Sequence, residues 1–392
     1  MKEMNTAMLM NLLHRKGTTT RAELTKATKL SPTTVSSLVE DLIRRGLVEE
    51  VGEKPAAGAG RRAISLRINK DGGYVIGISL GNRKLIGAVL NLHGECVAEC
   101  FAPIATGNDS LAEQIREALE ACLGQVESAK RADIRGIGIS APGIIDERSE
   151  TVLFSSLLKL NDFNPRREIA SYFPDAPIRI VNDANAAAFA EHYAGAGKGK
   201  TSLVYVTMNE GIGAGIILDS RIHSGYGGAA GEIGHITVDP GGEVCNCGQR
   251  GCVETVLTGP FILRRAQAVA RELGEAAPAD FDEVLGRYDA GEAWLEPIFD
   301  RIAATARLTI ASMVQMISPE VVVIEGWPNR SEKLSGRLRA ELERLPFPFR
   351  FTSGRVLPSA FGEKGALYGA ATLMLQRIFS ASAWDKSGGY RS

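Results

Sequence analysis

One histidine and three cysteines are the residues whose types and spacing most clearly indicate chemistry. They lie close together in the chain as His235, Cys245, Cys247 and Cys252. One imidazole and three thiolates form a closed tetrahedral ligand set for a structural zinc ion, because soft thiolates select zinc over magnesium or calcium. Four protein ligands leave no open position for water, so we expect no catalytic zinc. The alternative for these residues is a group of free cysteines.

The remaining cysteines and the composition indicate the compartment. Cys96, Cys100 and Cys122 are scattered through the sequence, which does not predict a disulfide framework. Hydrophobic residues make up 44% of the chain and charged residues 23%, the balance of a soluble globular protein. No run of about 18 apolar residues predicts a membrane span, and the first residues do not resemble a secretory signal. We therefore expect a cytoplasmic protein without membrane contact.

The elements that must position these residues fall into two parts of different charge. Residues 1–70 hold 13 lysines and arginines against 7 acidic residues, whereas the remaining residues hold 32 against 39. A basic head on an acidic body predicts that only the head approaches a polyanion. A chance fluctuation of charge in a short segment accounts for these numbers equally well.

The basic head has the pattern of a helix-turn-helix. Apolar residues at helical spacing predict a first helix over 4–16. Thr20 and Glu23 have the spacing of a capping box, which opens a second helix that ends at Thr28. Ser31 and Pro32 are a strong start for a third helix, which reaches Arg45 with one apolar stripe.

Two strand patterns complete a winged helix-turn-helix. Residues 47–51 and 63–68 alternate like strands, and a glycine-rich loop with an arginine pair joins them. Small hydroxyl side chains on the third helix can reach base edges in a major groove, and arginines in a wing can reach phosphates or the minor groove. The residues that we expect to contact double-stranded DNA are Thr33, Thr34, Ser36, Ser37, Arg44, Arg61 and Arg62. The alternative is a small three-helix domain that binds protein.

The sequence pattern of the acidic body predicts an α/β fold. Residues 74–79, 85–90 and 96–101 are expected to be strands, 110–127 a helix, and 134–140 a returning strand. Similar strand patterns recur at 203–208, 215–218 and 321–324.

The motifs of the body resemble those of the ROK family of repressors and sugar kinases. Residues 231–235 read Gly-Glu-Ile-Gly-His, and residues 245–254 read Cys-Asn-Cys-Gly-Gln-Arg-Gly-Cys-Val-Glu. The resemblance also covers Ala-Pro-Gly at 141–143, Asn-Asp-Ala-Asn-Ala-Ala at 182–187 and Gly-Ile-Gly-Ala-Gly at 211–215. An N-terminal winged helix is the hallmark of the family's repressor branch.

The resemblance implies an actin-like, hexokinase-like α/β domain with two lobes and a structural zinc loop, placed after the winged helix-turn-helix. We expect the DNA-binding domain over 1–70 and the sensor domain over 71–392. Its lobes would span about 71–183 and 184–360, with a C-terminal helix over 363–380 that returns to the first lobe. The family also implies a homodimer or a homotetramer.

The resemblance further implies a sugar pocket. In the family, sugar hydroxyls are held by the residues that correspond here to Asn182, Asp183, Glu232, His235 and Glu254. Carboxylates and amides suit a polyol because they accept and donate hydrogen bonds. If one ring nitrogen of His235 binds zinc, the other can still carry a proton to a sugar oxygen. Asp183 occupies the position of the general base in the kinases, but the same carboxylate can simply hold a hydroxyl.

The positions that face ATP in the kinases differ in this chain. The first phosphate motif, Asp-x-Gly-Gly-Thr in the family, reads Ser-Leu-Gly-Asn-Arg at 79–83, which places Ser79 and Arg83 at altered positions. The second phosphate loop carries Glu210, whose charge repels phosphate, and the paired glycine near adenosine is replaced by Glu-Gly-Trp at 325–327. The sugar-side Pro-Asn-Leu segment reads Phe-Ser-Ser-Leu-Leu at 154–158. We therefore expect no ATP binding and no catalytic residues.

These observations predict a DNA-binding transcriptional regulator of sugar metabolism, a repressor controlled by a sugar or sugar derivative in a degenerate kinase cleft. One alternative is an active ATP-dependent sugar kinase with a fused DNA-binding domain. Another is a zinc-dependent scaffold with no small ligand.

Overall fold

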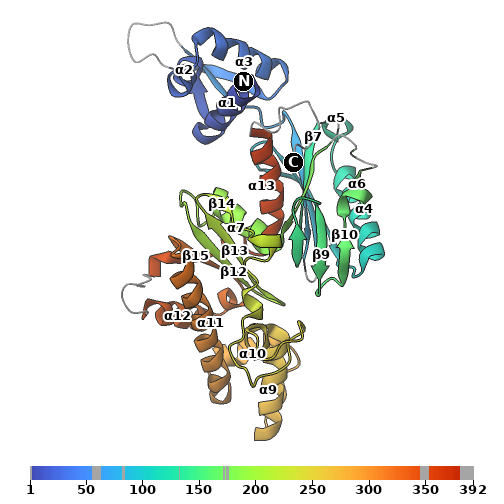
Figure 1. Cartoon of the computed structure of the whole chain (residues 1–392), viewed down its shortest axis with the longest axis vertical. Coiled ribbons are helices and arrows are strands. Elements are labelled where there is room, and N and C mark those ends of the chain that lie inside the picture. The colour runs from blue at the N-terminus through green and yellow to red at the C-terminus, as the bar shows by residue number, and fades with distance from the viewer. Residues whose placement is uncertain are drawn as a thin grey trace.

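The fold is that of a computed structural model, which describes residues 2–54, 63–81, 84–131, 133–170, 173, 176–344 and 353–379. The predicted DNA contacts Arg61 and Arg62 and the altered position Arg83 lie outside the described residues. Figure 1 shows a small head at one end of the molecule, followed by two α/β lobes.

The head has the elements of a winged helix-turn-helix. Its elements are α1 (Lys2–Lys16), β1 (Thr18–Thr20), α2 (Arg21–Thr28), α3 (Pro32–Arg44), β2 (Val48–Lys54) and β3 (Ala63–Ile68), with the strands in the order β1-β3-β2. The predicted capping box is confirmed: Thr20 Oγ1 accepts the Glu23 N–H (3.2 Å), and Glu23 Oε2 accepts the Thr20 N–H (3.0 Å). Ser31 Oγ accepts the Thr34 N–H (3.1 Å) and so caps α3 as predicted. The short strand β1 is not predicted from the sequence pattern.

The first lobe is built on a five-stranded sheet in the order β11-β7-β4-β5-β6. Its strands are β4 (Tyr74–Leu80), β5 (Lys84–Asn91), β6 (Cys96–Pro103), β7 (Ile134–Ala141) and β11 (Ile178–Asn182), with β4, β7 and β11 parallel. Alternate residues of β4 face opposite ways: Ile76 and Ile78 pack with α4 (Asn108–Gly124), whereas Val75 packs with the C-terminal helix. The smaller elements are α5 (Ser128–Arg131), α6 (Pro165–Ile169) and a three-stranded sheet of β8 (Ile144–Asp146), β9 (Thr151–Ser155) and β10 (Leu160–Phe163).

The second lobe has its own five-stranded sheet in the order β14-β13-β12-β15-β16. The strands are β12 (Leu203–Met208), β13 (Ile212–Leu218), β14 (Arg221–Ile222), β15 (Val321–Gly326) and β16 (Val356–Pro358). One face packs on α7 (Asp183–Ala194) and the other on the core that includes α11 (Glu296–Ile317). The other helices of this lobe are α8 (Glu254–Leu257), α9 (Gly259–Leu273), α10 (Phe281–Asp289) and α12 (Glu332–Glu343).

Helices α7 and α13 (Gly365–Phe379) join the two lobes by packing with almost no side chain between them. A Cβ added at Gly369 of α13 would lie 1.8 Å from the carbonyl oxygen of Ala186 on α7. A Cβ added at Gly138 of β7 would lie 2.0 Å from the carbonyl oxygen of Ala370. Because only glycine permits these approaches, α13 lies directly against both α7 and the first sheet, as Figure 1 shows.

A buried carboxylate holds the turn that leads into α13. Glu191 of α7 is fully buried. Its Oε1 accepts hydrogen bonds from Ser359 Oγ (2.6 Å) and the Ala360 N–H (2.8 Å), and its Oε2 accepts one from the Ala196 N–H (2.7 Å). These hydrogen bonds satisfy the buried carboxylate. They also attach the turn before α13 directly to α7.

The head docks on this helix pair. Leu9 and Leu13 of α1 belong to one continuous buried cluster with residues of the first sheet and α13. Asn11 Nδ2 donates a hydrogen bond to the carbonyl of Phe379 (2.8 Å), and the His14 ring stacks on Phe379 and on Tyr193 of α7, with centroids 4.8 Å and 5.3 Å away. His14 Nε2 also contacts the Tyr193 hydroxyl. Burial lowers the pKa of His14, which favours the neutral ring at this contact.

Within the described residues, no helix combines the length and apolar character needed to cross a membrane.

Replacing Gly369 with alanine tests the close packing of α7 and α13. The added methyl group would meet backbone rather than a movable side chain, so we expect the free energy of unfolding to fall by about 2–3 kcal/mol. Chemical denaturation of the purified chain measures the change. The matched control is Gly336→Ala in α12, where a Cβ meets nothing within 4 Å, and where alanine should stabilise the helix by up to about 1 kcal/mol. Equal effects of the two substitutions would contradict the packing described here.

Candidate functional site

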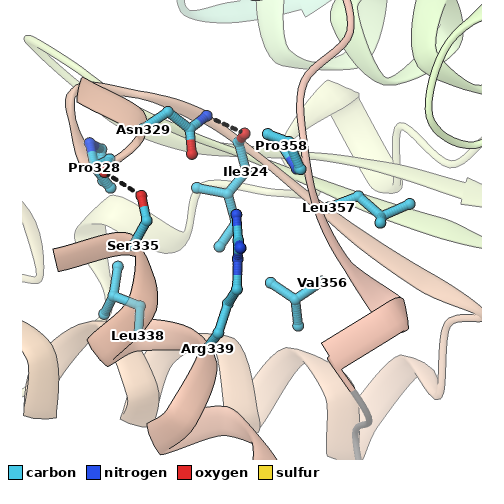
Figure 2. A pocket seen from close by; sticks show the side chains of 9 residues that line it. All are labelled: Ile324, Pro328, Asn329, Ser335, Leu338, Arg339, Val356, Leu357 and Pro358. Atoms are coloured by element: carbon cyan, nitrogen blue, oxygen red, sulfur yellow. Dashed lines mark hydrogen bonds between the residues drawn. The ribbon is translucent and has the colours of Figure 1, made fainter. Parts of the chain in front are cut away.

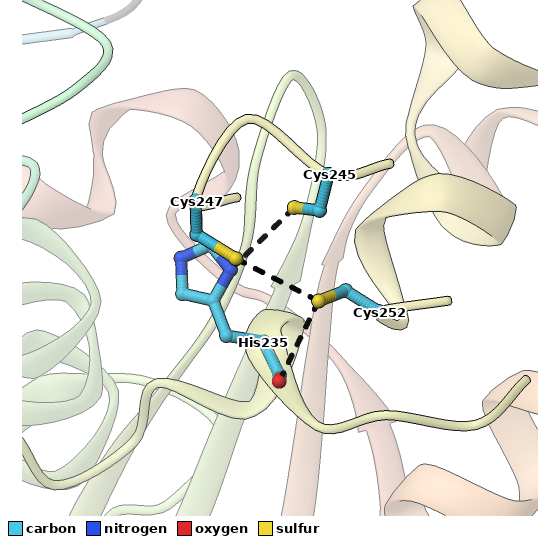
Figure 3. Close-up of side chains that lie close together, drawn as sticks. All are labelled: His235, Cys245, Cys247 and Cys252. Atoms are coloured by element: carbon cyan, nitrogen blue, oxygen red, sulfur yellow. Dashed lines mark hydrogen bonds between the residues drawn. The ribbon is translucent and has the colours of Figure 1, made fainter. Parts of the chain in front are cut away.

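The four predicted metal ligands come together in one loop of the second lobe. Figure 3 shows the side chains of His235, Cys245, Cys247 and Cys252 facing one another. One ligand atom from each lies within 4.8 Å of all the others. The chain can turn this tightly because Gly251 adopts a φ of +66°, and a Cβ there would lie 1.5 Å from the carbonyl oxygen of Asp239.

The spacing of these atoms fits a tetrahedral metal ion. The Sγ atoms of Cys247 and Cys252 are 3.7 Å apart, and Cys245 Sγ is 3.8 Å from His235 Nδ1. Zinc–sulfur bonds of about 2.3 Å require tetrahedron edges of about 3.8 Å. The Cys3His cluster could therefore hold a metal ion, and its donor set is that of a structural site.

His235 lies between the metal cluster and a neighbouring cleft. Its Nδ1 faces Cys245, whereas its Nε2 is 3.9 Å from Oε2 of Glu232. Glu254 lies on the metal side of the same ring, with its Oε2 3.9 Å from Nδ1, and its Oε1 accepts the Ile212 N–H (3.2 Å). One ring nitrogen is thus available to a metal and the other to the cleft, as the sequence analysis proposed.

The cleft is a cavity of about 880 Å³ with lining residues from both lobes. Ser79 and Ile86 belong to the first sheet, whereas Thr207 and Ala214 belong to the second. The structure brings all five predicted sugar residues to its wall, namely Asn182, Asp183, Glu232, His235 and Glu254. This volume is in the ordinary range of small-molecule sites.

Asn182 and Asp183 reach the cleft because they start α7. Asn182 Oδ1 caps the helix by accepting the Asn185 N–H (3.1 Å), and its Nδ2 donates to the carbonyl of Gly143 (3.1 Å). Asp183 Oδ1 accepts the Ala184 N–H (2.8 Å). Burial raises the pKa of Asp183 above the usual range of an aspartic acid.

The residues that depart from the family's kinase pattern line the same cavity. Ser79, Glu210 and Glu325 are all on its wall, as are Ser155 and Ser156 of the altered sugar-side segment. Other lining residues were not singled out from the sequence, among them Lys84, Thr207, Asn209, Asp280 and Phe281. Their only signal was helical or strand periodicity, which does not distinguish a cavity wall from a core.

The predicted DNA contacts have different surroundings on the head. Thr33, Ser37 and Arg44 of α3 are exposed, and Ser36 is half-buried. The Thr34 hydroxyl is half-buried and lies 2.8 Å from Ser31 Oγ, within the cap of the helix. The Arg44 guanidinium contacts the Asp41 carboxylate.

Two cysteines that are scattered in the sequence meet in the first lobe. Cys100 Sγ of β6 lies 2.8 Å from Cys122 Sγ of α4, and both are free thiols. A hydrogen bond from Cys122 lowers the pKa of Cys100 to about 7, and the same bond together with burial raises the pKa of Cys122.

A sequence profile described as the ROK family matches residues 75–377 of the chain. The chain belongs to the ROK family. A profile described as the MarR family matches residues 1–62, which cover most of the head. A xylose repressor of Caldicellulosiruptor bescii is 28% identical over 97% of each chain.

Two solved structures share the architecture. A ROK family transcriptional regulator, a homolog of the E. coli MLC protein, superposes with a TM-score of 0.83 at 24% identity, covering 98% of each chain. A ROK family glucokinase from Streptomyces griseus, solved with glucose and AMPPNP, superposes with a TM-score of 0.67 at 25% identity, covering 77% of this chain and 99% of the kinase. The predicted fold is confirmed: a winged helix-turn-helix precedes an actin-like, hexokinase-like ROK domain.

Removal of one thiolate tests the metal cluster. We expect elemental analysis of the purified chain to find about one metal ion per chain, and Cys252→Ser to lose it. Because metal binding supplies folding energy, the midpoint of thermal unfolding should fall by about 5–10 °C, as expected for a loss of a few kcal/mol in a domain of this size. Cys96→Ser is the matched control, since Cys96 is an exposed free thiol away from the cluster. An unchanged metal content in Cys252→Ser would contradict the assignment.

Proposed function

We propose that the protein is a sugar-responsive transcriptional repressor of sugar metabolism genes. The observation that carries the proposal is the direct docking of a winged helix-turn-helix head on the helix that begins in the ROK cleft. The resemblance to a xylose repressor over nearly the whole chain supports it. In this proposal residues 1–70 bind an operator, residues 71–392 bind the sugar, and two or four copies assemble to read paired half-sites.

The metal in this proposal is zinc with a structural role. Thiolates and one imidazole favour zinc, and the ion would fix His235 so that its Nε2 faces the cleft beside Glu232. The sugar would be held by Asn182, Asp183, Glu232, His235 and Glu254, which offer carboxylate, amide and imidazole groups to its hydroxyls.

The cleft supports a receptor rather than an enzyme. Glu210 and Glu325 stand on the wall where the family's kinases hold ATP, and negative charge there opposes phosphate. We therefore propose that Asp183 holds a sugar hydroxyl without acting as a base.

Helix α7 gives the sugar signal a short path to the head. Its 12 residues span about 18 Å, with Asn182 and Asp183 at the cleft end and Tyr193 against His14 of α1 at the other. A sugar that binds one arrangement of the lobes more tightly would move this helix relative to the head and so shift the DNA-binding equilibrium.

Fluorescence anisotropy with duplexes from the region upstream of the protein's own gene tests the proposal. We expect at least one duplex to bind about 10³-fold more tightly than a scrambled duplex at moderate salt. A sugar from a monosaccharide and disaccharide panel should change that affinity by about 5- to 150-fold, the usual range of allosteric coupling. Binding without sequence preference, with and without sugars, would overturn the proposal.

An active sugar kinase is a second candidate, because Asp183 lies in the cleft at the position of the kinase base. A coupled assay of ADP release separates the two functions. Turnover at an ordinary enzymatic rate that Asp183→Asn abolishes would establish the kinase, whereas no turnover above background supports the receptor.

Replacing Tyr193 with alanine tests the path through α7. The variant should bind sugar within about twofold of the wild-type affinity, because Tyr193 lies away from the cleft lining, while the response of DNA affinity to sugar should be lost. Anisotropy with and without sugar measures the response, and calorimetry measures sugar binding. Tyr226→Ala is the matched control, since Tyr226 is fully exposed. A full sugar response in Tyr193→Ala would place the coupling elsewhere.

A further inference from the structure

The cleft extends well beyond the predicted sugar residues. The segment that carries Glu232 and His235 lies against β13, where the Ala214 N–H donates to the carbonyl of Gly231 (2.8 Å). The same cavity continues past β12 to Glu325 and Trp327 at the end of β15. Two strand spacings of about 4.8 Å separate β13 from β15, so the cavity is at least about 10 Å long at this edge of the sheet. One sugar ring does not fill that length.

The far part of the cavity is built around a buried carboxylate with a free oxygen. Glu325 is only 6% exposed. Its Oε2 accepts hydrogen bonds from Thr207 Oγ1 and Asn209 Nδ2, both at 2.8 Å, whereas its Oε1 has no partner among the described residues. Because Glu325 lines the cavity, this oxygen can accept a hydrogen bond from a ligand hydroxyl there.

Two aromatic rings stand beside this carboxylate. Phe281 at the start of α10 and Trp327 after β15 both line the cavity and pack edge to face, with centroids 5.3 Å apart and planes at 82°. The turn that carries Trp327 is held from behind, where Asn329 Nδ2 donates to the carbonyl of Ile324 (2.7 Å) and Ser335 Oγ to that of Pro328 (2.6 Å), as Figure 2 shows. Trp327 is only 3% exposed and packs behind Phe281, so Phe281 offers the apolar ring surface to the cavity. Such a surface near a hydrogen-bond acceptor suits the carbon face and the hydroxyl edge of a sugar.

The charges on the described wall of the cavity disfavour an anionic ligand. Among the described residues, seven acidic side chains line it, namely Asp183, Glu210, Glu232, Glu254, Asp280, Glu325 and Glu363. The lysine and the arginine on the described wall are already paired: Lys84 Nζ is 2.7 Å from Oε2 of Glu363, and Arg330 is 2.7 Å from Asp282 Oδ1. On the described wall a phosphate group would therefore meet acidic side chains, while both described cations are already paired.

We propose that the part of the cleft formed by Glu325, Phe281 and Trp327 is a second sugar subsite, so that the effector is an uncharged disaccharide or longer glycoside. The first ring occupies the pocket of Asp183, Glu232 and His235, and the second donates a hydroxyl to Glu325 Oε1 and rests on Phe281, which Trp327 supports from behind. This inference rests on the proposed sugar-sensing function and names the class of sugar that the protein senses.

Isothermal titration of the metal-loaded full chain tests the subsite. The probes are xylose with xylobiose, glucose with cellobiose and maltose, and N-acetylglucosamine with its β-1,4-linked dimer, together with glucose 6-phosphate and adenosine. We expect one disaccharide to bind at least about tenfold more tightly than its monosaccharide, the gain expected from one added hydrogen bond to a charged group. Glucose 6-phosphate should bind more weakly than glucose.

Two variants assign the gain to the far part of the cleft. Glu325→Gln keeps an oxygen for Thr207 and Asn209, and Phe281→Ala removes an aromatic surface. Each should reduce disaccharide affinity by about tenfold while monosaccharide affinity stays within about twofold. Glu272→Gln is the matched control, because Glu272 is exposed on α9 and does not line the cavity.

Each outcome separates this inference from the proposed function. A monosaccharide that binds as tightly as its disaccharides, or a gain that survives Glu325→Gln, overturns the second subsite and leaves the sugar receptor standing. Tighter binding of glucose 6-phosphate or adenosine than of any neutral sugar overturns the subsite as well. Failure of the whole panel to bind overturns the sugar receptor and the subsite together.

Discussion

The close approach of α7 and α13 is the constraint on which the rest of the structure depends. Glycines at 138 and 369 let backbone meet backbone, so two sheets and a DNA-binding head share one pair of helices. Packed interiors transmit displacement because they contain little free space to absorb it. In the proposed function, a change at the first turn of α7 would therefore reach the head through one helix rather than through a chain of loops.

The Cys3His cluster and the cavity beside it differ in how their negative charge is balanced. The Cys3His cluster brings together thiolates, whose negative charge a metal cation would neutralise. The cavity beside it is lined by carboxylates, and the two basic side chains on its described wall, Lys84 and Arg330, already form ion pairs with Glu363 and Asp282. His235 belongs to both, with one nitrogen for each. In the proposed function, the acidic residues on one side of the cleft oppose phosphate while those beside His235 hold a polyol.

The helix starts of the head and the metal cluster could be predicted from the sequence, because each depends on residues that are close together in the chain. The capping residues Thr20, Glu23 and Ser31 set helix starts within a few residues, and the spacing of the cysteines was enough to predict the metal cluster. The five sugar residues required the family resemblance, because a lone carboxylate such as Glu232 has no local signature. Contacts such as His14 with Tyr193, or Phe281 with Trp327, join distant segments, and helical periodicity could not reveal them.

The docking surface of the head is partly made from the last helix of the chain. Phe379 accepts a hydrogen bond from Asn11 and stacks on His14, although 368 positions separate Asn11 from Phe379 and the head is made before α13. The head can therefore fold early during synthesis. The surface on which it docks is complete only after α13 has been synthesised. A chain that stops before α13 lacks Phe379, so its head loses the hydrogen-bond acceptor of Asn11 and a stacking partner of His14.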